Sequence, residues 1–136
     1  MGRVQLAINV TDLDRAIEFY SKLFQAQPAK VREGYANFAL DEPPLKLVLM
    51  QGREGGTLNH LGVEVFSTDD VAEATRRLQA EGLPTREEDN VSCCYAVQDK
   101  VWVSDPDGAP WEVYTVLADA PEAKPCADAT CGPGCC

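Results

Sequence analysis

The stretch Val4-Gln5-Leu6-Ala7-Ile8-Asn9-Val10 decides the fold, because Asn59-His60-Leu61-Gly62-Val63-Glu64-Val65 repeats its pattern. Apolar side chains occupy alternate positions in both stretches, which is typical of a β-strand with one buried face. Each stretch is followed by apolar residues at helical spacing and then by three shorter segments that have strand character. The sequence therefore predicts two copies of a β-α-β-β-β module.

Helix start signals and turn residues set the limits of the other elements. Thr11 or Asp12 can cap the first helix, whose apolar positions run from Leu13 to Phe24. The second helix is expected over 68–81, with Thr68 or Asp69 as its cap and Gly82 at its end. The shorter strands are expected over 29–32, 35–40 and 45–50 in the first module, and over 85–88, 95–103 and 111–116 in the second.

The expected fold class is α+β, an open, curved, mixed sheet in which the two modules surround a metal cleft. One domain is expected over residues 1–117, with module one over 1–51, module two over 57–117 and a glycine-containing linker between them. Residues 118–136 are mostly Ala, Pro, Gly and Cys and offer few large side chains to bury. This composition predicts a flexible, cysteine-rich tail.

The composition excludes several classes of partner. With 12 Lys and Arg against 22 Asp and Glu, the net charge of −10 argues against nucleic acid or anionic membrane as the main partner. No apolar run approaches the roughly 20 residues of a membrane span, so a cytoplasmic location is expected. In a cytoplasmic chain the six cysteines do not suit a disulfide framework, and the single histidine excludes a Cys2His2 zinc finger.

Aligning the two modules identifies candidate metal ligands. The alignment places Gln5 on His60 and Lys46 on Glu112, so a pseudo-twofold would direct all four side chains toward one region. An amide, an imidazole and a carboxylate suit a divalent metal such as Fe(II), Mn(II), Ni(II) or Zn(II), whereas a protonated lysine is no ligand. The alternative is that His60 is a hydrogen-bonded structural residue and Glu112 a paired surface carboxylate.

Cys93 and Cys94 are neighbours in the sequence, which makes a disulfide between them strained. Their Cα atoms lie ~3.8 Å apart, below the usual ~4.4–6.8 Å of a disulfide. Adjacent residues of a strand point to opposite faces, so the backbone must leave strand geometry if both thiols act together. Such a pair suits a thiophilic atom such as trivalent arsenic or cadmium, on a mobile loop expected around 87–94. Alternatively, both are small buried residues, or only one thiol matters.

The paired modules, the opening residues 4–20 and the closing Asp105-Pro106-Asp107-Gly108-Ala109-Pro110-Trp111-Glu112-Val113-Tyr114 together resemble the vicinal oxygen chelate superfamily over about residues 3–117. That superfamily includes glyoxalase I, extradiol dioxygenases and fosfomycin-resistance enzymes. Its metal ligands lie in the first and last strands of each module. Glyoxalase I has a carboxylate at the position of Lys46, so this departure argues against lactoylglutathione chemistry.

Residues 34–39, 43–49, 58–64 and 93–103 resemble a narrower branch, the carbon–arsenic lyases, to which cadmium-induced proteins are closely similar. The resemblance implies a non-heme Fe(II)-dependent dioxygenase of arsenic detoxification. It would cleave the carbon–arsenic bond of methylarsenite and trivalent aromatic arsenicals to release arsenite. It also implies Gln5, His60 and Glu112 as catalytic metal ligands, with Ni(II), Co(II) or Zn(II) able to replace iron, and Cys93 and Cys94 as the substrate-binding thiols.

Several alternatives stay open at this stage. The tail thiols Cys126, Cys131, Cys135 and Cys136 are either accessory arsenic ligands or dispensable. The chain could instead bind cadmium or arsenite through its thiols without turnover, or be a fosfomycin- or glyoxalase-type transferase that leaves the cysteine pair unexplained. The modules could also pair within one chain or swap between the two chains of a homodimer.

Overall fold

The computed structural model of the protein describes residues 2–52, 54–93 and 95–120. Strands and helices follow the order β-α-β-β-β twice in this part of the chain, so the predicted α+β fold with two modules is confirmed. The chain divides into two compact units. The first unit is Arg3–Leu61, and the second contains Gly2 and the described residues from Gly62 onward.

Every helix and strand expected from the sequence is present, with differences mainly at the ends. The first five elements are β1 (Arg3–Val10), α1 (Leu13–Phe24), β2 (Lys30–Arg32), β3 (Tyr35–Leu40) and β4 (Leu45–Gln51). The next five are β5 (Thr57–Glu64), α2 (Thr68–Ala80), β6 (Arg86–Cys93), β7 (Ala96–Ser104) and β8 (Pro110–Asp119).

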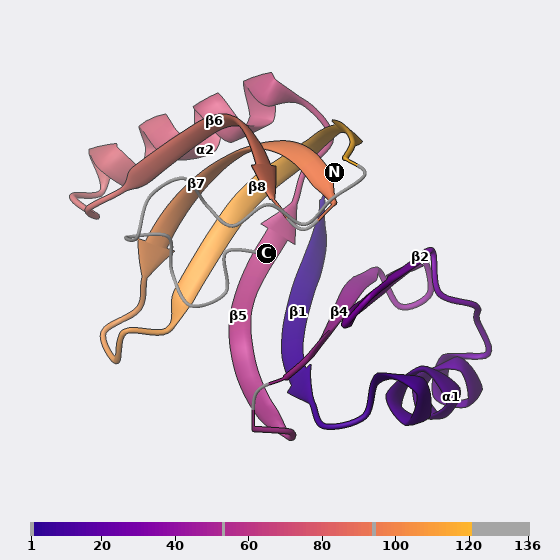
Figure 1. Cartoon of the computed structure of the whole chain (residues 1–136). Coiled ribbons are helices and arrows are strands. Elements are labelled where there is room, and N and C mark those ends of the chain that lie inside the picture. Colours follow the sequence, from indigo (N-terminus) through magenta and orange to yellow (C-terminus); the bar gives the residue numbers. More distant parts are fainter. Residues whose placement is uncertain (1, 53, 94, 121–136) are drawn as a thin grey trace. The chain divides into compact units, whose positions relative to one another are not determined.

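In the first unit the strands are hydrogen-bonded in the order β2-β3-β4-β1-β5, and α1 packs against one face of them (Figure 1). Asp12 caps α1 by accepting a hydrogen bond from the backbone N–H of Arg15. The apolar face of α1 and the inward residues of β1, β3 and β4 form one core, whose buried members are Val10, Leu13, Ala36, Phe38, Leu40, Leu47 and Leu49.

In the second unit the order is β5-β8-β7-β6, and α2 lies along one face of these strands (Figure 1). Val71 and Leu78 of α2 pack on Val101 of β7. The cap of α2 was expected at Thr68 or Asp69 but is Ser67, whose hydroxyl accepts from the backbone N–H of Asp70. The expectation was wrong by one residue because Ser67, Thr68 and Asp69 are all good capping residues.

Strand β6 differs most from the expectation. A strand over 85–88 and then a loop were predicted, but β6 continues to Cys93 with a bulge between Glu88 and Val91. It is the last strand in its sheet order and pairs with β7. An edge strand tolerates charged and turn-forming residues, and this tolerance made β6 look like a loop in the sequence.

Strand β8 continues beyond residue 117, where the domain was expected to end. Ala118 and Asp119 were assigned to the tail, but they pair with Val97 and Ala96 as the end of β8. Ala120 is buried, and its backbone N–H donates to the carbonyl of Tyr95. The four tail cysteines lie outside the described residues.

The polar face of the first strand is buried, whereas the alternation predicted burial of the apolar face, on which Leu6 and Ile8 are only partly buried. Gln5, Ala7 and Asn9 are buried, while Val4 is 49% exposed. Polar side chains can occupy a buried face when they are hydrogen-bonded, and both Gln5 and Asn9 are hydrogen-bonded.

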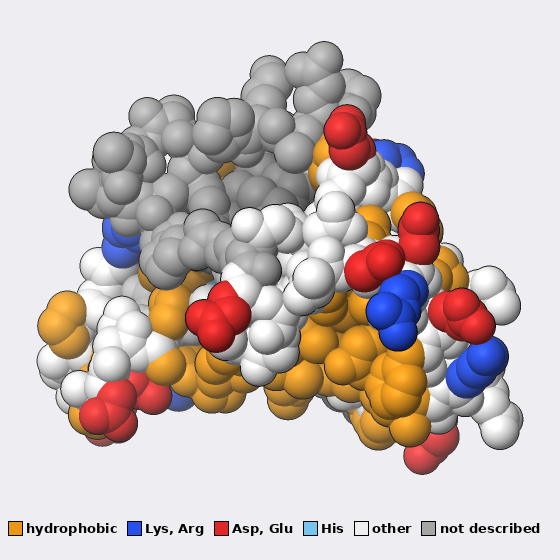
Figure 2. Space-filling view, turned by 60° about the horizontal axis from the view of Figure 1, so that its bottom comes forward, with side chains coloured by type: hydrophobic (Ala, Val, Ile, Leu, Met, Phe, Trp, Pro, Cys, Tyr) orange, Lys and Arg blue, Asp and Glu red, His pale blue; other side chains and the backbone are white. Residues whose placement is uncertain are grey.

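Some apolar side chains are exposed and are visible in the space-filling view (Figure 2); on α1 they include Phe19 and Leu23. Neither helix of the described chain is long and apolar enough to cross a membrane.

Candidate functional site

The first unit brings Gln5 and His60 together from strands β1 and β5. The side-chain nitrogen Nε2 of Gln5 lies 3.1 Å from Nε2 of His60, and both side chains are buried, His60 completely. The amide N–H of Gln5 therefore donates to the lone pair of the imidazole, provided that this ring nitrogen carries no proton. The predicted pairing of these two residues across the repeat is confirmed as a contact.

The other ring nitrogen of His60 decides where the proton lies. Its Nδ1 is 2.9 Å from the side-chain oxygen Oδ1 of Asn59. An amide oxygen only accepts hydrogen bonds, so Nδ1 carries the proton and Nε2 keeps the lone pair. A neutral imidazole in this tautomer is the form that binds a metal through Nε2. The sequence analysis did not assign a role to Asn59, although its position next to the single histidine was visible.

Lys46 lies beside Gln5 in the first unit. β1 and β4 are parallel, and Lys46 is the register partner of Gln5. The lysine is half-buried. The residue beside Gln5 is therefore a lysine, whose protonated side chain cannot serve as a fourth metal ligand.

Glu112 belongs to β8 in the second unit and is 2% exposed. Its Oε1 lies 3.0 Å from the ammonium Nζ of Lys100, a side chain that is equally buried. The alternative that Glu112 is a paired surface carboxylate is confirmed for the pairing and wrong for the location, because the carboxylate lies in the interior. A buried charge needs such a partner, since its desolvation is otherwise uncompensated.

The sequence analysis missed Lys100 as the partner of Glu112. The ammonium group of Lys100 also lies 5.4 Å from the ring centre of Trp102 and 6.0 Å from that of Tyr114. Trp102 is the register partner of Glu112, and Lys100 that of Tyr114. Lys100 and Trp102 alternate along β7, and Glu112 and Tyr114 alternate along β8, so the sequence suggested that each pair shares one face of its strand. Only the register of β7 against β8 shows which of these side chains are neighbours.

The donor atoms of the first unit fit a divalent metal. Among the described residues, no three His, Cys, Asp and Glu side chains gather in a metal-binding arrangement. A metal at His60 would therefore need an amide oxygen. Gln5 carries one, but its nitrogen Nε2 faces the imidazole in this structure, so the amide would have to turn over to bind a metal together with His60. A nitrogen and an oxygen donor of this kind suit Fe(II), Mn(II), Ni(II), Co(II) and Zn(II).

Cys93, the first cysteine of the adjacent pair, lies at the end of a strand. Cys93 is the last residue of β6, with its backbone paired to Ala96, while Cys94 lies outside the described residues. Tyr95 follows with a φ of 65°, in the left-handed region. The backbone has thus left strand geometry at Tyr95, as expected if neighbouring thiols are to act together.

Asp99 holds the bulge that precedes Cys93. Its carboxylate accepts hydrogen bonds from the backbone N–H of Asn90 at 2.6 Å and from the hydroxyl of Thr68 at 2.8 Å. It therefore ties the start of α2 to the bulge. Because a bulge shifts the register by one residue, this contact sets which residue of β7 faces Cys93.

Comparisons with known proteins agree with this fold. Residues 2–113 match the family model described as the Glyoxalase/Bleomycin resistance protein/Dioxygenase superfamily. A protein of Thermomonospora curvata named "Trivalent organoarsenical cleaving enzyme" is 57% identical over 133 residues, covering 96% of this chain and 88% of that protein. "Cadmium-induced protein CadI" of Mycobacterium tuberculosis is 60% identical over 121 residues, covering 88% of this chain and 80% of its own length.

Solved structures show the same fold at lower identity. An extradiol ring-cleaving dioxygenase from B. fuscum superposes with a TM-score of 0.63 at 23% identity, covering 87% of this chain and 33% of that one. A Mn(II)-bound glyoxalase from Novosphingobium aromaticivorans gives a TM-score of 0.62 at 21% identity, covering 95% of this chain and 44% of that one. Likeness at this level concerns the fold alone.

Proposed function

The chain belongs to the glyoxalase, bleomycin resistance protein and dioxygenase superfamily, and from this premise we propose that it is an Fe(II)-dependent dioxygenase that cleaves the carbon–arsenic bond of trivalent organoarsenicals. The observation that carries the proposal is the buried pair of Gln5 and His60, with the lone pair of the imidazole directed at the amide. The name of the Thermomonospora curvata relative supports the reaction class and the substrate class.

In this proposal Gln5, His60 and Glu112 hold the metal, and Ni(II), Co(II) or Zn(II) can take its place. Iron supplies Lewis acidity and the activation of dioxygen when bound. His60 contributes Nε2 because Asn59 keeps the proton on Nδ1. Lys100 balances the charge of Glu112 while the protein is free of metal.

Cys93 and Cys94 are proposed to capture the arsenic atom of the substrate. Thiolates bind soft, thiophilic elements, and held substrate reacts faster than free substrate because its orientation is already set. For methylarsenous acid the atoms balance without an added reductant. The acid and one dioxygen give arsenous acid and one formaldehyde, so the carbon is oxidised, the carbon–arsenic bond breaks and dioxygen is reduced.

The test is an assay on the protein loaded anaerobically with Fe(II). Methylarsenite or a trivalent aromatic arsenical is added, air is admitted, and arsenite is measured. The proposal expects arsenite to form with the wild type and to be lost in His60→Ala. His60→Ala that keeps the native rate under the same iron loading would contradict the assignment of His60.

A second candidate is a thiol-based protein that binds cadmium or arsenite without turnover. The 60% identity to a protein named for its induction by cadmium favours this candidate. The same assay separates the two, because a binding protein retains methylarsenite, consumes no oxygen and releases no arsenite.

Other expectations from the sequence stay predictions. They are the single domain over residues 1–117, the cytoplasmic location, the homodimer and the accessory role of Cys126, Cys131, Cys135 and Cys136.

A further inference from the structure

We propose that Asn9, Asn59 and Thr57 form a one-way relay of hydrogen bonds that fixes the tautomer of His60, with the proton on Nδ1 and the lone pair on Nε2. The two asparagines are therefore positioning residues, which act on the imidazole and not on the substrate. The use of that lone pair for a metal rests on the proposed function, whereas the tautomer itself does not.

The direction of the relay is set at its outer end. The hydroxyl of Thr57 lies 2.5 Å from the backbone carbonyl oxygen of Glu54. A carbonyl oxygen only accepts, so the hydroxyl hydrogen must point at Glu54. The hydroxyl oxygen of Thr57 then accepts from Nδ2 of Asn9 at 2.9 Å. One backbone carbonyl thus fixes which end of the Asn9 amide faces Thr57.

This direction is passed on to the buried imidazole. Since Nδ2 of Asn9 faces Thr57, its Oδ1 faces Asn59 and accepts from Nδ2 of that residue at 2.9 Å. The Oδ1 of Asn59 is then left for His60, and Nδ1 of the ring donates to it at 2.9 Å. At the far side of the ring, the amide of Gln5 donates to Nε2 at 3.1 Å.

Burial makes the relay difficult to reverse. Asn9 and Asn59 are 5% and 8% exposed, and His60 is 0% exposed. Turning either amide over would place donor against donor or acceptor against acceptor where water cannot compensate. An unsatisfied buried group of this kind corresponds to a bias of about 5- to 160-fold toward the tautomer with the proton on Nδ1.

The relay has a consequence that simple packing of the asparagines does not have. Asn9 acts on His60 through Asn59, so its substitution should change the imidazole, because Asn59 then loses the group that holds its amide in one orientation. If the asparagines only filled space, substitution of Asn9 by a residue of similar volume would leave the ring as it was.

The experiment is nitrogen-15 NMR of the imidazole in the full-length, metal-free protein at about pH 8, where an unperturbed histidine is neutral. The chain contains one histidine, so both ring signals belong to His60. The wild type should show a protonated Nδ1 and an unprotonated Nε2. Asn59→Leu and Asn9→Leu should both shift the proton toward Nε2, whereas Asn59→Asp, which keeps an acceptor at Nδ1, should leave Nδ1 protonated.

Asn37→Leu is the matched control, because Asn37 is equally buried in the first unit but donates to the hydroxyl of Tyr35. It should leave the tautomer unchanged. A second measurement is the affinity for Zn(II), which should fall about 10- to 100-fold in Asn59→Leu and not in Asn37→Leu.

A wild-type ring protonated on Nε2 would overturn the relay, as would Asn59→Leu and Asn9→Leu variants that keep the wild-type tautomer. If the NMR pattern is as expected but no arsenite is released in the activity assay, the relay stands and the proposed function falls.

Discussion

Replacing Lys100 by Met should destabilise the protein strongly, because Lys100 is the buried partner of Glu112. Both side chains are almost completely removed from water, with 1% and 2% exposed, and their charged atoms are 3.0 Å apart. Met keeps the unbranched stem of lysine and fills similar space. The substitution therefore removes the charge while disturbing the packing as little as possible, and it leaves the Glu112 carboxylate buried without Lys100.

The expected loss is about 4 kcal/mol of unfolding free energy. Removing one partner of a buried ion pair costs about 3–5 kcal/mol. The contact of the ammonium with the Trp102 ring, at 5.4 Å, accounts for about 1 kcal/mol of this loss. With a urea dependence of about 2 kcal/mol per M, the midpoint of unfolding should fall by about 2 M.

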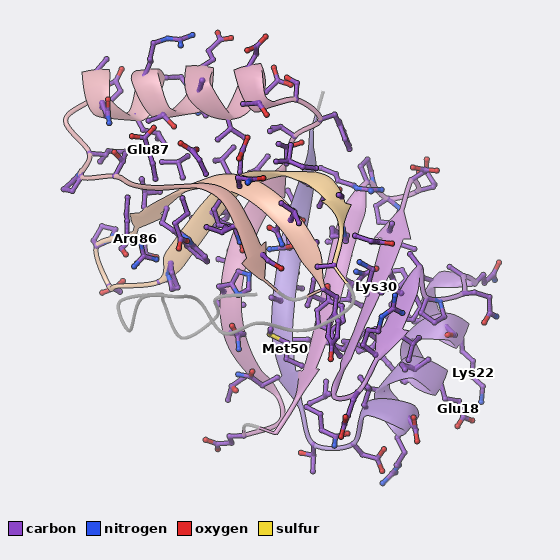
Figure 3. The ribbon with its side chains drawn as sticks, turned by 45° about the horizontal axis from the view of Figure 1, so that its top comes forward. Glu18, Lys22, Lys30, Met50, Arg86 and Glu87 are labelled. Atoms are coloured by element: carbon purple, nitrogen blue, oxygen red, sulfur yellow. The ribbon has the colours of Figure 1, made fainter. Side chains whose placement is uncertain are left out.

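Lys22→Met is the matched control. Lys22 and Glu18 form an ion pair of the same 3.0 Å length on α1, but their side chains are 75% and 69% exposed, and both project from the helix (Figure 3). An exposed pair of this kind contributes about 0.3–0.5 kcal/mol, so its midpoint should hardly move. Urea titrations of metal-free protein, followed by the fluorescence of Trp102 and Trp111, compare the two variants.

Equal midpoint shifts for Lys100→Met and Lys22→Met would refute the reasoning from burial. The double variant Lys100→Met/Glu112→Gln provides a second check. It carries no buried charge at either position, so it should be more stable than the sum of the two single losses predicts. Strict additivity of the two substitutions would show that Lys100 and Glu112 do not interact.

Further predictions concern the thiols, the end of β8 and the bulge. Cys93→Ser/Cys94→Ser should lose binding of methylarsenite, measured by calorimetry, but keep Fe(II); native turnover in this variant would contradict the capture role. A chain ending at residue 117 should melt several degrees below a chain ending at residue 120, because it lacks the last pairs of β8 and the buried Ala120; equal melting temperatures would contradict this. Asp99→Ala should cost about 2 kcal/mol in urea unfolding and speed hydrogen exchange at the amide of Asn90; unchanged exchange would show that Asp99 does not hold the bulge.

The helices and strands were largely predictable because each depends on the apolar periodicity and the capping residues of its own segment. Alternating apolar residues predicted β1 and β5, and α1 begins at Leu13 after its cap Asp12. The repeat itself carried more information than either half. It paired Gln5 with His60, residues 55 positions apart in the chain, and the structure places them in contact.

The remaining features depend on partners that are distant in the chain. β6 reads as a polar loop, and only its pairing with β7 and the anchor at Asp99 make it a strand. The link between Lys100 and Glu112 requires the register of β7 against β8. The relay to His60 depends on the direction of each hydrogen bond, which no spacing of residues encodes.

The central claim is tested most directly by measuring dioxygen consumption and arsenite release together in the Fe(II)-loaded protein supplied with methylarsenite. The account predicts one dioxygen consumed for each arsenite released, and no arsenite under argon. Methylarsenite that stays bound and intact in the presence of iron and oxygen would contradict it.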